Sequence, residues 1–442
     1  MRDYRKDVNT IVSESIRSVL PDAAVQRALA DFERPSGRLI LVAAGKAAWQ
    51  MARAAVDHLT QSAGSGAQSV IDGGIVITKY GHVMGEIPGV TCYETGHPVP
   101  DENGFAATAK ALALVNDLTE KDAVLFLLSG GGSALFELPI IPGEELQEIT
   151  GQLLAAGADI VEINTIRKRL SAVKGGSFGL ACAPARVYNV ILSDVLGDRV
   201  DMIASGPAAP DISTSAEALA IADKYDLTLS PQARDLLRED NPAKLDHVTT
   251  IVTGSVKELC RAAAESCRGL GYKPVILTEE LCCEAADAGR ELGEFARAFL
   301  TGDNDTVKGI LDKYVPDMQL PVADRMTEKG RLAIILGGET VVHVRGTGLG
   351  GRNQEIALAA APLIDGLEAA VFSFGSDGTD GPTDAAGGYA DGNTISLLKN
   401  AGIDPEQALA DNDSYHALQA VDGLIITGPT GTNVNDVSIA LI

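Results

Sequence analysis

Short apolar runs rich in β-branched residues alternate with helical patterns along nearly the whole chain, and this alternation limits the possible folds more than any other feature. The predicted strands are Leu39–Ala43, Ile75–Thr78, Val90–Glu94, Val124–Leu128, Tyr188–Leu192, Thr249–Thr253, Pro274–Thr278, Leu332–Leu336, Val341–Val344, Ala370–Phe374 and Leu424–Thr427. Helical patterns such as Ala47–Leu59, Phe105–Leu118, Ser255–Leu270 and Asn353–Leu363 lie between them. Such alternation predicts an α/β fold with doubly wound, largely parallel sheets.

The length of 442 residues favours two domains, because single hydrophobic cores stop growing at a smaller size. A polar stretch that contains proline, Ser230–Leu245, interrupts the strand–helix rhythm. We therefore predict one domain over 1–240 and a second over 241–442, with an active-site cleft between them. In this prediction the last residues of the chain can pack back on the first domain.

Charge and cysteine usage exclude several classes of function. The chain has 36 basic and 60 acidic residues, a formal net charge of −24, so it has no electrostatic footprint for nucleic acid or an anionic membrane. None of the 6 cysteines has C-x-x-C spacing, which argues against zinc and thioredoxin-like chemistry. The first twenty residues form an amphipathic pattern rather than a signal peptide, and no apolar run could span a bilayer. We expect a cytoplasmic protein.

Two glycine-containing loops follow predicted strands and are suited to bind anions. Lys46 follows Gly45 at a predicted helix start, where its ammonium adds to the positive end of the helix dipole. Ser129, Gly130, Gly131, Gly132 and Ser133 follow the strand Val124–Leu128, and their backbone N–H groups could form an anion-binding nest. A solvated lysine and a flexible turn are the alternatives for these two loops.

A basic segment and two acidic strand ends add further candidate site residues. Asn164–Gly176 (NTIRKRLSAVKGG) is the densest basic cluster and ends at Lys174, although a solvated basic face would also explain it. Asp194 and Asp377 each follow a predicted strand, where a carboxylate can hold magnesium or deprotonate a hydroxyl. A turn-forming Asp-Gly is the alternative at Asp377.

The glycines Gly346, Gly348 and Gly351 match the dinucleotide-binding pattern G-x-G-x-x-G after the predicted strand Val341–Val344. This match keeps open a dehydrogenase that uses NAD(P)H. However, Arg352 follows at once and suits phosphate or carboxylate, and the next strand-end carboxylate lies farther along than a ribose-binding residue should.

Together these segments resemble the class II glycerate kinases, whose C-terminal half is called the MOFRL domain. The matching segments cover nearly the whole chain in order: AAGKAA (43–48), ETGHPVPDENG (94–104), LLSGGGSAL (127–135), NTIRKRLSAVKGG (164–176), LSDVLGD (192–198), ASGPAAPD (204–211), LGGET (336–340), GTGLGGRNQE (346–355), GSDGTDGPTDAAG (375–387) and GTNVND (431–436).

The resemblance implies a kinase that transfers the γ-phosphoryl group of ATP to D-glycerate and forms 2-phosphoglycerate. It implies that Lys46, Asp194 and Arg352 are catalytic and that Glu339 and Asp377 hold Mg²⁺. The phosphates are expected to contact Ser129, Gly130, Gly131, Gly132, Ser133, Lys174, Gly348, Gly350 and Gly351. The family has also been labelled hydroxypyruvate reductase, which is the alternative activity. No nucleic-acid or membrane partner is expected, and a homodimer stays open.

Overall fold

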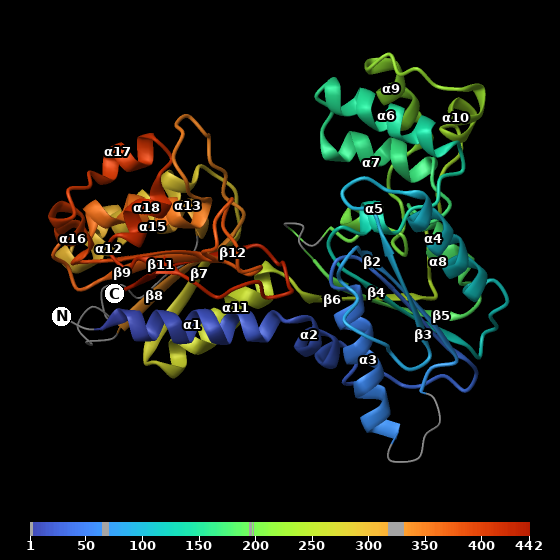
Figure 1. Cartoon of the computed structure of the whole chain (residues 1–442), viewed down its shortest axis with the longest axis horizontal. Helices are drawn as coiled ribbons and strands as arrows, with labels where there is room; N and C mark the ends of the chain where they lie inside the picture. The colour runs from blue at the N-terminus through green and yellow to red at the C-terminus, as the bar shows by residue number, and fades with distance from the viewer. Residues whose placement is uncertain (1–2, 64–69, 194–196, 198, 317–330) are drawn as a thin grey trace. The chain divides into compact units, whose positions relative to one another are not determined.

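The computed structural model of the chain describes residues 3–63, 70–193, 197, 199–316 and 331–442 (Figure 1). The chain divides into two compact units: Pro21–Thr253, here the N-terminal unit, and Met1–Leu20 with Gly254–Ile442, here the C-terminal unit. The division therefore differs from the boundary predicted after residue 240. Strand β6 (Val248–Gly254) is the reason, because it completes the first sheet.

The N-terminal unit contains a six-stranded sheet in the order β3-β2-β1-β4-β5-β6. Its other strands are β1 (Leu39–Ala44), β2 (Gly73–Lys79), β3 (Val90–Thr95), β4 (Ala123–Leu128) and β5 (Arg186–Leu192), and the pairs from β3 to β5 are parallel. This order is that of a doubly wound fold, in which the direction of winding reverses between β1 and β4. The predicted α/β class is confirmed.

Strand β1 shows why the predicted strands of this sheet are continuous apolar runs. Leu39, Leu41 and Ala43 pack on one face with α2 (Pro21–Ala28) and α3 (Ala48–Ala63). The alternate residues pack on the other face with α4 (Glu102–Val115) and α8 (Ser177–Ala181). Because helices cover both faces, every position of the strand is apolar.

A separate helical core belongs to the same unit. It is formed by α6 (Gly143–Ala155), α7 (Ile160–Arg169), α9 (Ser215–Lys224) and α10 (Pro231–Leu236), which lie together in Figure 1. The short helices α5 (Gly132–Leu135) and η2 (Ile203–Ser205) complete the helices described in this unit.

The C-terminal unit contains a second six-stranded sheet, in the order β11-β10-β9-β12-β8-β7. Its strands are β7 (Tyr272–Leu281), β8 (Arg331–Gly338), β9 (Ala370–Gly375), β10 (Gly387–Asp391), β11 (Leu424–Ile425) and β12 (Asp436–Leu441). Strands β10 and β12 run antiparallel to their neighbours, and these two strands were not predicted. The last residues belong to this sheet, because β12 pairs with β8 and β9.

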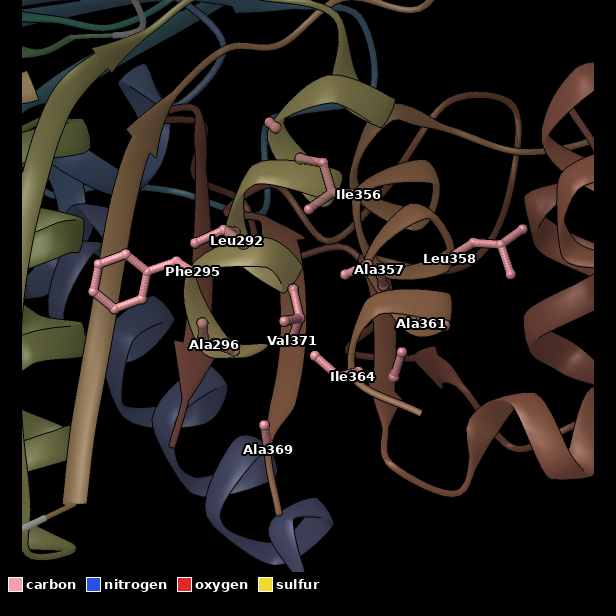
Figure 2. Close-up of a cluster of buried hydrophobic side chains, with 14 of the residues drawn as sticks. Leu292, Phe295, Ala296, Ile356, Ala357, Leu358, Ala361, Ile364, Ala369 and Val371 are labelled. Carbon is pink, nitrogen blue, oxygen red and sulfur yellow. The ribbon is translucent and has the colours of Figure 1, made fainter. Parts of the chain in front are cut away.

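Helices cover both faces of the second sheet. One face packs on α12 (Ala285–Thr301) and α15 (Arg352–Ala360), whose Leu292, Phe295 and Ile356 lie in the cluster shown in Figure 2. Near them lie α13 (Asn304–Tyr314), η3 (Ala361–Leu363), α16 (Thr394–Asn400), α17 (Pro405–Ala410) and α18 (Ser414–Gln419). The other face packs on α11 (Val256–Gly269).

Helix α1 (Tyr4–Val19) confirms the amphipathic helix predicted at the N-terminus and packs along α11 in the C-terminal unit (Figure 1). Its buried apolar side chains are Val8, Ile11, Val12, Ile16 and Val19. No helix in the described part of the chain is both long and apolar enough to cross a membrane.

The packing of α1 predicts a clear loss of stability in Ile11→Ala. Ile11 is fully buried, so the truncation should lower the free energy of unfolding by about 2–4 kcal/mol through lost burial and a residual cavity. Lys6→Ala, an exposed position on the same helix, is the matched control and should change it by less than about 0.5 kcal/mol. Urea unfolding measures both, and equal stability of the two variants would contradict the assigned packing.

Candidate active site

The loops that follow β1 and β4 are joined by hydrogen bonds at the point where the winding of the first sheet reverses. The backbone N–H of Lys46 donates to Gly130 O at 2.9 Å, and Ala47 N–H donates to Ser129 Oγ at 3.0 Å. Gly45 has a φ of +120°, and a Cβ there would lie 2.3 Å from Ser129 Oγ. Ligands of open α/β sheets bind at this reversal. The structure therefore brings together Lys46 and the glycine loop, two segments that the sequence analysis named separately as anion-binding candidates.

The Gly130–Ser133 loop presents backbone donors. The carbonyls of Gly131 and Gly132 accept the N–H groups of Ala134, Leu135 and Phe136. Among the residues that the structure describes, the N–H groups of Gly130 to Ser133 have no protein acceptor. Gly131 has a φ of +83°, which a residue with a side chain rarely adopts. The loop thus has the donors that an anion-binding nest requires.

Three further basic side chains lie near Lys46: Lys79, His82 and His97. His82 Nδ1 contacts Lys46 O at 3.0 Å. Burial lowers the pKa of His97, and the charges of Lys46, Lys79 and His82 lower it further. Sequence reasoning did not assign His82 or His97 a role, although His97 lies in the ETGHPVPDENG motif.

Lys174 was predicted to bind phosphate, and the structure corrects this prediction. Its side chain is fully buried, and Nζ donates to Ser133 O at 3.0 Å, Phe136 O at 3.3 Å and Ala204 O at 3.3 Å. Glu137 lies 3.5 Å away as a buried counter-ion. Burial lowers the pKa of Lys174 to about 8. An ammonium has three donors, so none remains for a ligand.

Arg352, at the start of α15, binds two carboxylates. Its Nε and Nη2 donate to Asp436 at 2.5 and 3.2 Å, and its Nη1 donates to Glu339 Oε1 at 2.8 Å. The antiparallel register explains the meeting, because Asp436 pairs with Gly338 in β8 and with Gly375 in β9. The first residue of β12 is thereby held at the carboxyl ends of both neighbours.

Asp436 was not predicted as a site residue, although it ends the GTNVND motif. Burial raises the pKa of Asp436 to about 7, against the lowering effect of the Arg352 charge. A Cβ on Gly375 would lie 3.3 Å from both Asp377 Oδ1 and Asp436 Oδ1, so these two carboxylates are close neighbours.

The predicted Mg²⁺ site at Glu339 and Asp377 would bind the ion through carboxylate oxygens. Within the described part of the chain, no group of three or more His, Cys, Asp or Glu side chains is arranged to hold a metal ion. Mg²⁺ in phosphotransferases usually takes one or two carboxylates and completes its shell with water and substrate phosphates. This mode of binding fits the three carboxylates that lie near Arg352 or Gly375, namely Asp377, Asp436 and Glu339.

The Gly346–Gly351 loop differs from the prediction. Asn412 Oδ1 accepts Gly346 N–H at 3.0 Å, and Asp411 O accepts Gly348 N–H at 2.9 Å. The N–H of Gly348 is therefore used within the protein, and the predicted contact of Gly348 with phosphate stays a prediction. The predicted strand Val341–Val344 is also absent: Val341 forms only an isolated bridge with Glu284.

The last two glycines of this loop lie against other segments of the C-terminal unit. A Cβ on Gly350 would lie 2.2 Å from Ser414 Oγ, and one on Gly351 would lie 2.3 Å from Asp380 Cγ. Asp380 accepts the N–H groups of Asn353 and Gln354 and so caps α15. Close packing accounts for both glycines, and their predicted contact with phosphate stays a prediction. Asp194 lies outside the described residues.

Family profiles match both halves of the chain, and known relatives match nearly its full length. A profile described as a domain of unknown function (DUF4147) matches residues 7–238, and the MOFRL family profile matches residues 332–436. A D-glycerate 2-kinase from Thermotoga maritima is 47% identical, covering 98% of this chain and 97% of the relative. A glycerate 2-kinase from Pyrococcus horikoshii is 37% identical, covering 100% and 98%. The crystal structure of a Thermotoga maritima glycerate kinase matches with a TM-score of 0.88 and 47% identity over 99% of both chains.

The contrast between Lys174 and Lys46 predicts opposite effects on stability. Lys174→Met should lower the free energy of unfolding by about 3 kcal/mol, because three carbonyls and Glu137 lose a buried partner. Lys46→Met should change it by no more than about 0.5 kcal/mol, since this side chain is exposed. Urea unfolding of both variants tests the assignment. A stable Lys174→Met would show that the buried ammonium is not a structural element.

Proposed function

The chain belongs to the class II glycerate kinase family, which carries the MOFRL domain, and we propose that it transfers the γ-phosphoryl group of ATP to D-glycerate. The products are 2-phosphoglycerate and ADP. The names of the two glycerate 2-kinase relatives, at 47% and 37% identity over essentially the full length, support this substrate and the 2-position.

One observation supports the phosphotransfer chemistry above all others. Lys46 lies beside four backbone N–H groups that have no acceptor among the described residues, at the reversal point of a doubly wound sheet. Phosphoryl transfer needs positioning of the phosphates and neutralisation of their charge rather than covalent chemistry. A lysine beside a nest of N–H donors supplies both. We assign the ATP phosphates to Lys46 and to the loop from Ser129 to Ser133.

The residues of the C-terminal unit supply the remaining charges. Arg352 has five N–H donors, and three of them bind Asp436 and Glu339, so two stay available for substrate oxygens. Asp377 and Glu339 would hold Mg²⁺, which neutralises charge on the phosphates when it is bound. We keep Asp194 as the residue proposed to orient or deprotonate the 2-hydroxyl.

The alternative, an NAD(P)H-dependent hydroxypyruvate reductase, loses its sequence support in the structure. The G-x-G-x-x-G pattern requires a preceding strand, a following helix and N–H groups directed at the pyrophosphate. Here the preceding strand is absent, and the N–H groups of Gly346, Thr347, Gly348 and Leu349 bind residues of the turn 411–413. The pattern therefore gives no reason to prefer reduction over phosphotransfer.

An enolase-coupled assay tests both the activity and the position of the phosphate. The purified protein with D-glycerate, ATP and Mg²⁺ should generate phosphoenolpyruvate in the presence of enolase alone, at the rate at which ADP forms. Enolase accepts 2-phosphoglycerate and needs a mutase to use the 3-isomer. A signal that requires added mutase would assign phosphorylation to the 3-hydroxyl. Oxidation of NADH with hydroxypyruvate, and no ADP, would favour the reductase.

Substitution of the two proposed catalytic cations should impair turnover without unfolding the protein. Lys46→Ala and Arg352→Ala should each lower kcat/KM by at least about 100-fold, ~2.7 kcal/mol of transition-state stabilisation. Arg53→Ala is the control, because Arg53 is paired with Asp57 on the surface of α3. Steady-state kinetics and thermal melting measure the effects. Near-normal kinetics in either variant would remove that residue from the mechanism.

A further inference from the structure

Four basic side chains gather around the Gly131 turn of the N-terminal unit. A Cβ on Gly131 would lie 3.0 Å from His97 Nε2 and 3.2 Å from Lys46 Cγ. Lys79 and His82 are close enough to His97 for their charges to lower its pKa. These four side chains come from three separate segments, which places the turn inside a basic cluster.

The described residues provide no carboxylate partner for this cluster. The nearby acids bind other groups: Asp101 accepts Gly104 N–H at 2.9 Å and Tyr80 Oη–H at 2.8 Å, and Glu94 accepts Val83 N–H at 2.9 Å. The chain has 60 acidic and only 36 basic residues, so a basic side chain without a counter-ion is unusual here. Mutual repulsion among the cluster is a cost that a bound anion would remove.

The two histidines differ in their hydrogen bonds. His82 Nδ1–H donates to Lys46 O at 3.0 Å, which orients this ring beside the lysine. The imidazole of His97 has no hydrogen-bond partner among the described residues, and its Nε2 lies on the side of the glycine turn. His97 can therefore present a donor to an anion bound at this turn.

We propose that His97 is a ligand-binding residue that holds the phosphate oxygens of the nucleotide in its protonated form, so that nucleotide binding takes up a proton. The inference rests on the proposed function, because it assigns the nucleotide phosphates to this turn. The cluster then includes the charges of Lys46 and Lys79 and a charge on His97 that arrives with the ligand.

The direction of the pH dependence follows from these charges. In the free protein, burial and the charges of Lys46, Lys79 and His82 keep the pKa of His97 below its usual value, which favours the neutral ring. Phosphate oxygens beside the ring favour the cation and raise the pKa of the bound state. Binding then takes up protons between the two pKa values, and affinity falls as pH rises through the bound pKa.

Calorimetric titration of the full chain with ADP tests the proposal. Measurements at about pH 6.5 in two buffers of different ionisation enthalpy should show net proton uptake, which disappears by about pH 8. Between these pH values the affinity should weaken about threefold in the native chain, because a bound-state shift of about one pKa unit gives its full tenfold effect only well below the free pKa. His97→Gln should bind ADP with less proton uptake and with little dependence on pH. His58→Gln, on α3, is the matched control and should behave like the native chain.

Proton NMR of the 6 histidine rings gives a second measurement that does not depend on the affinity of a variant. The ring resonance of His97 is identified as the one that is missing from the spectrum of His97→Gln. In the native chain this resonance should titrate at a higher pH when ADP is bound. No proton uptake and an unchanged titration would overturn the proposal, even if the enolase-coupled assay establishes the kinase. Proton uptake with D-glycerate instead of ADP would also overturn it, because the cluster would then bind the substrate carboxylate.

Discussion

The hydrogen bonds between the loops after β1 and β4 are the contacts on which the N-terminal site depends. They join Lys46 and Ala47 to Ser129 and Gly130, and they form because the winding of the sheet reverses between these two strands. The glycines at 45 and 131 permit the close approach. A side chain at either position would meet atoms of the opposite loop or of His97, so the geometry of the site and the identity of these residues are linked.

The buried side chain of Lys174 stabilises the glycine loop through hydrogen bonds. The ammonium of Lys174 binds the carbonyls of Ser133 and Phe136, which fixes the end of the glycine loop. It also binds Ala204 O, next to a turn in which Ala204 and Ser205 have positive φ values. Non-glycine residues in this conformation are strained and persist only where the surroundings hold them. The segment 174–176 does so, since Gly175 and Gly176 donate to Ser205 O and Gly206 O.

In the C-terminal unit, the pairing of strands brings the charged side chains together. An antiparallel strand, β12, lies between β8 and β9, so its first residue meets the last residues of both. Asp436 and Glu339 thereby meet around Arg352, and Asp377 lies next to Asp436. Because burial disfavours the charged form of Asp436, the guanidinium is needed to keep a carboxylate there.

The sequence by itself determined the α/β class and most strands, because hydrophobic periodicity is local, and it placed Lys46 and the glycine loop each after a strand. Only the tertiary structure decided which basic residues are free to bind a ligand. Lys174 is buried among carbonyls, and Gly348 donates to Asp411, a residue distant in sequence. Asp436 belongs to the site through an antiparallel register that no local pattern reports. Burial and hydrogen-bond occupancy depend on which segments meet in space, and for that reason a spacing of residues along the chain could not reveal them.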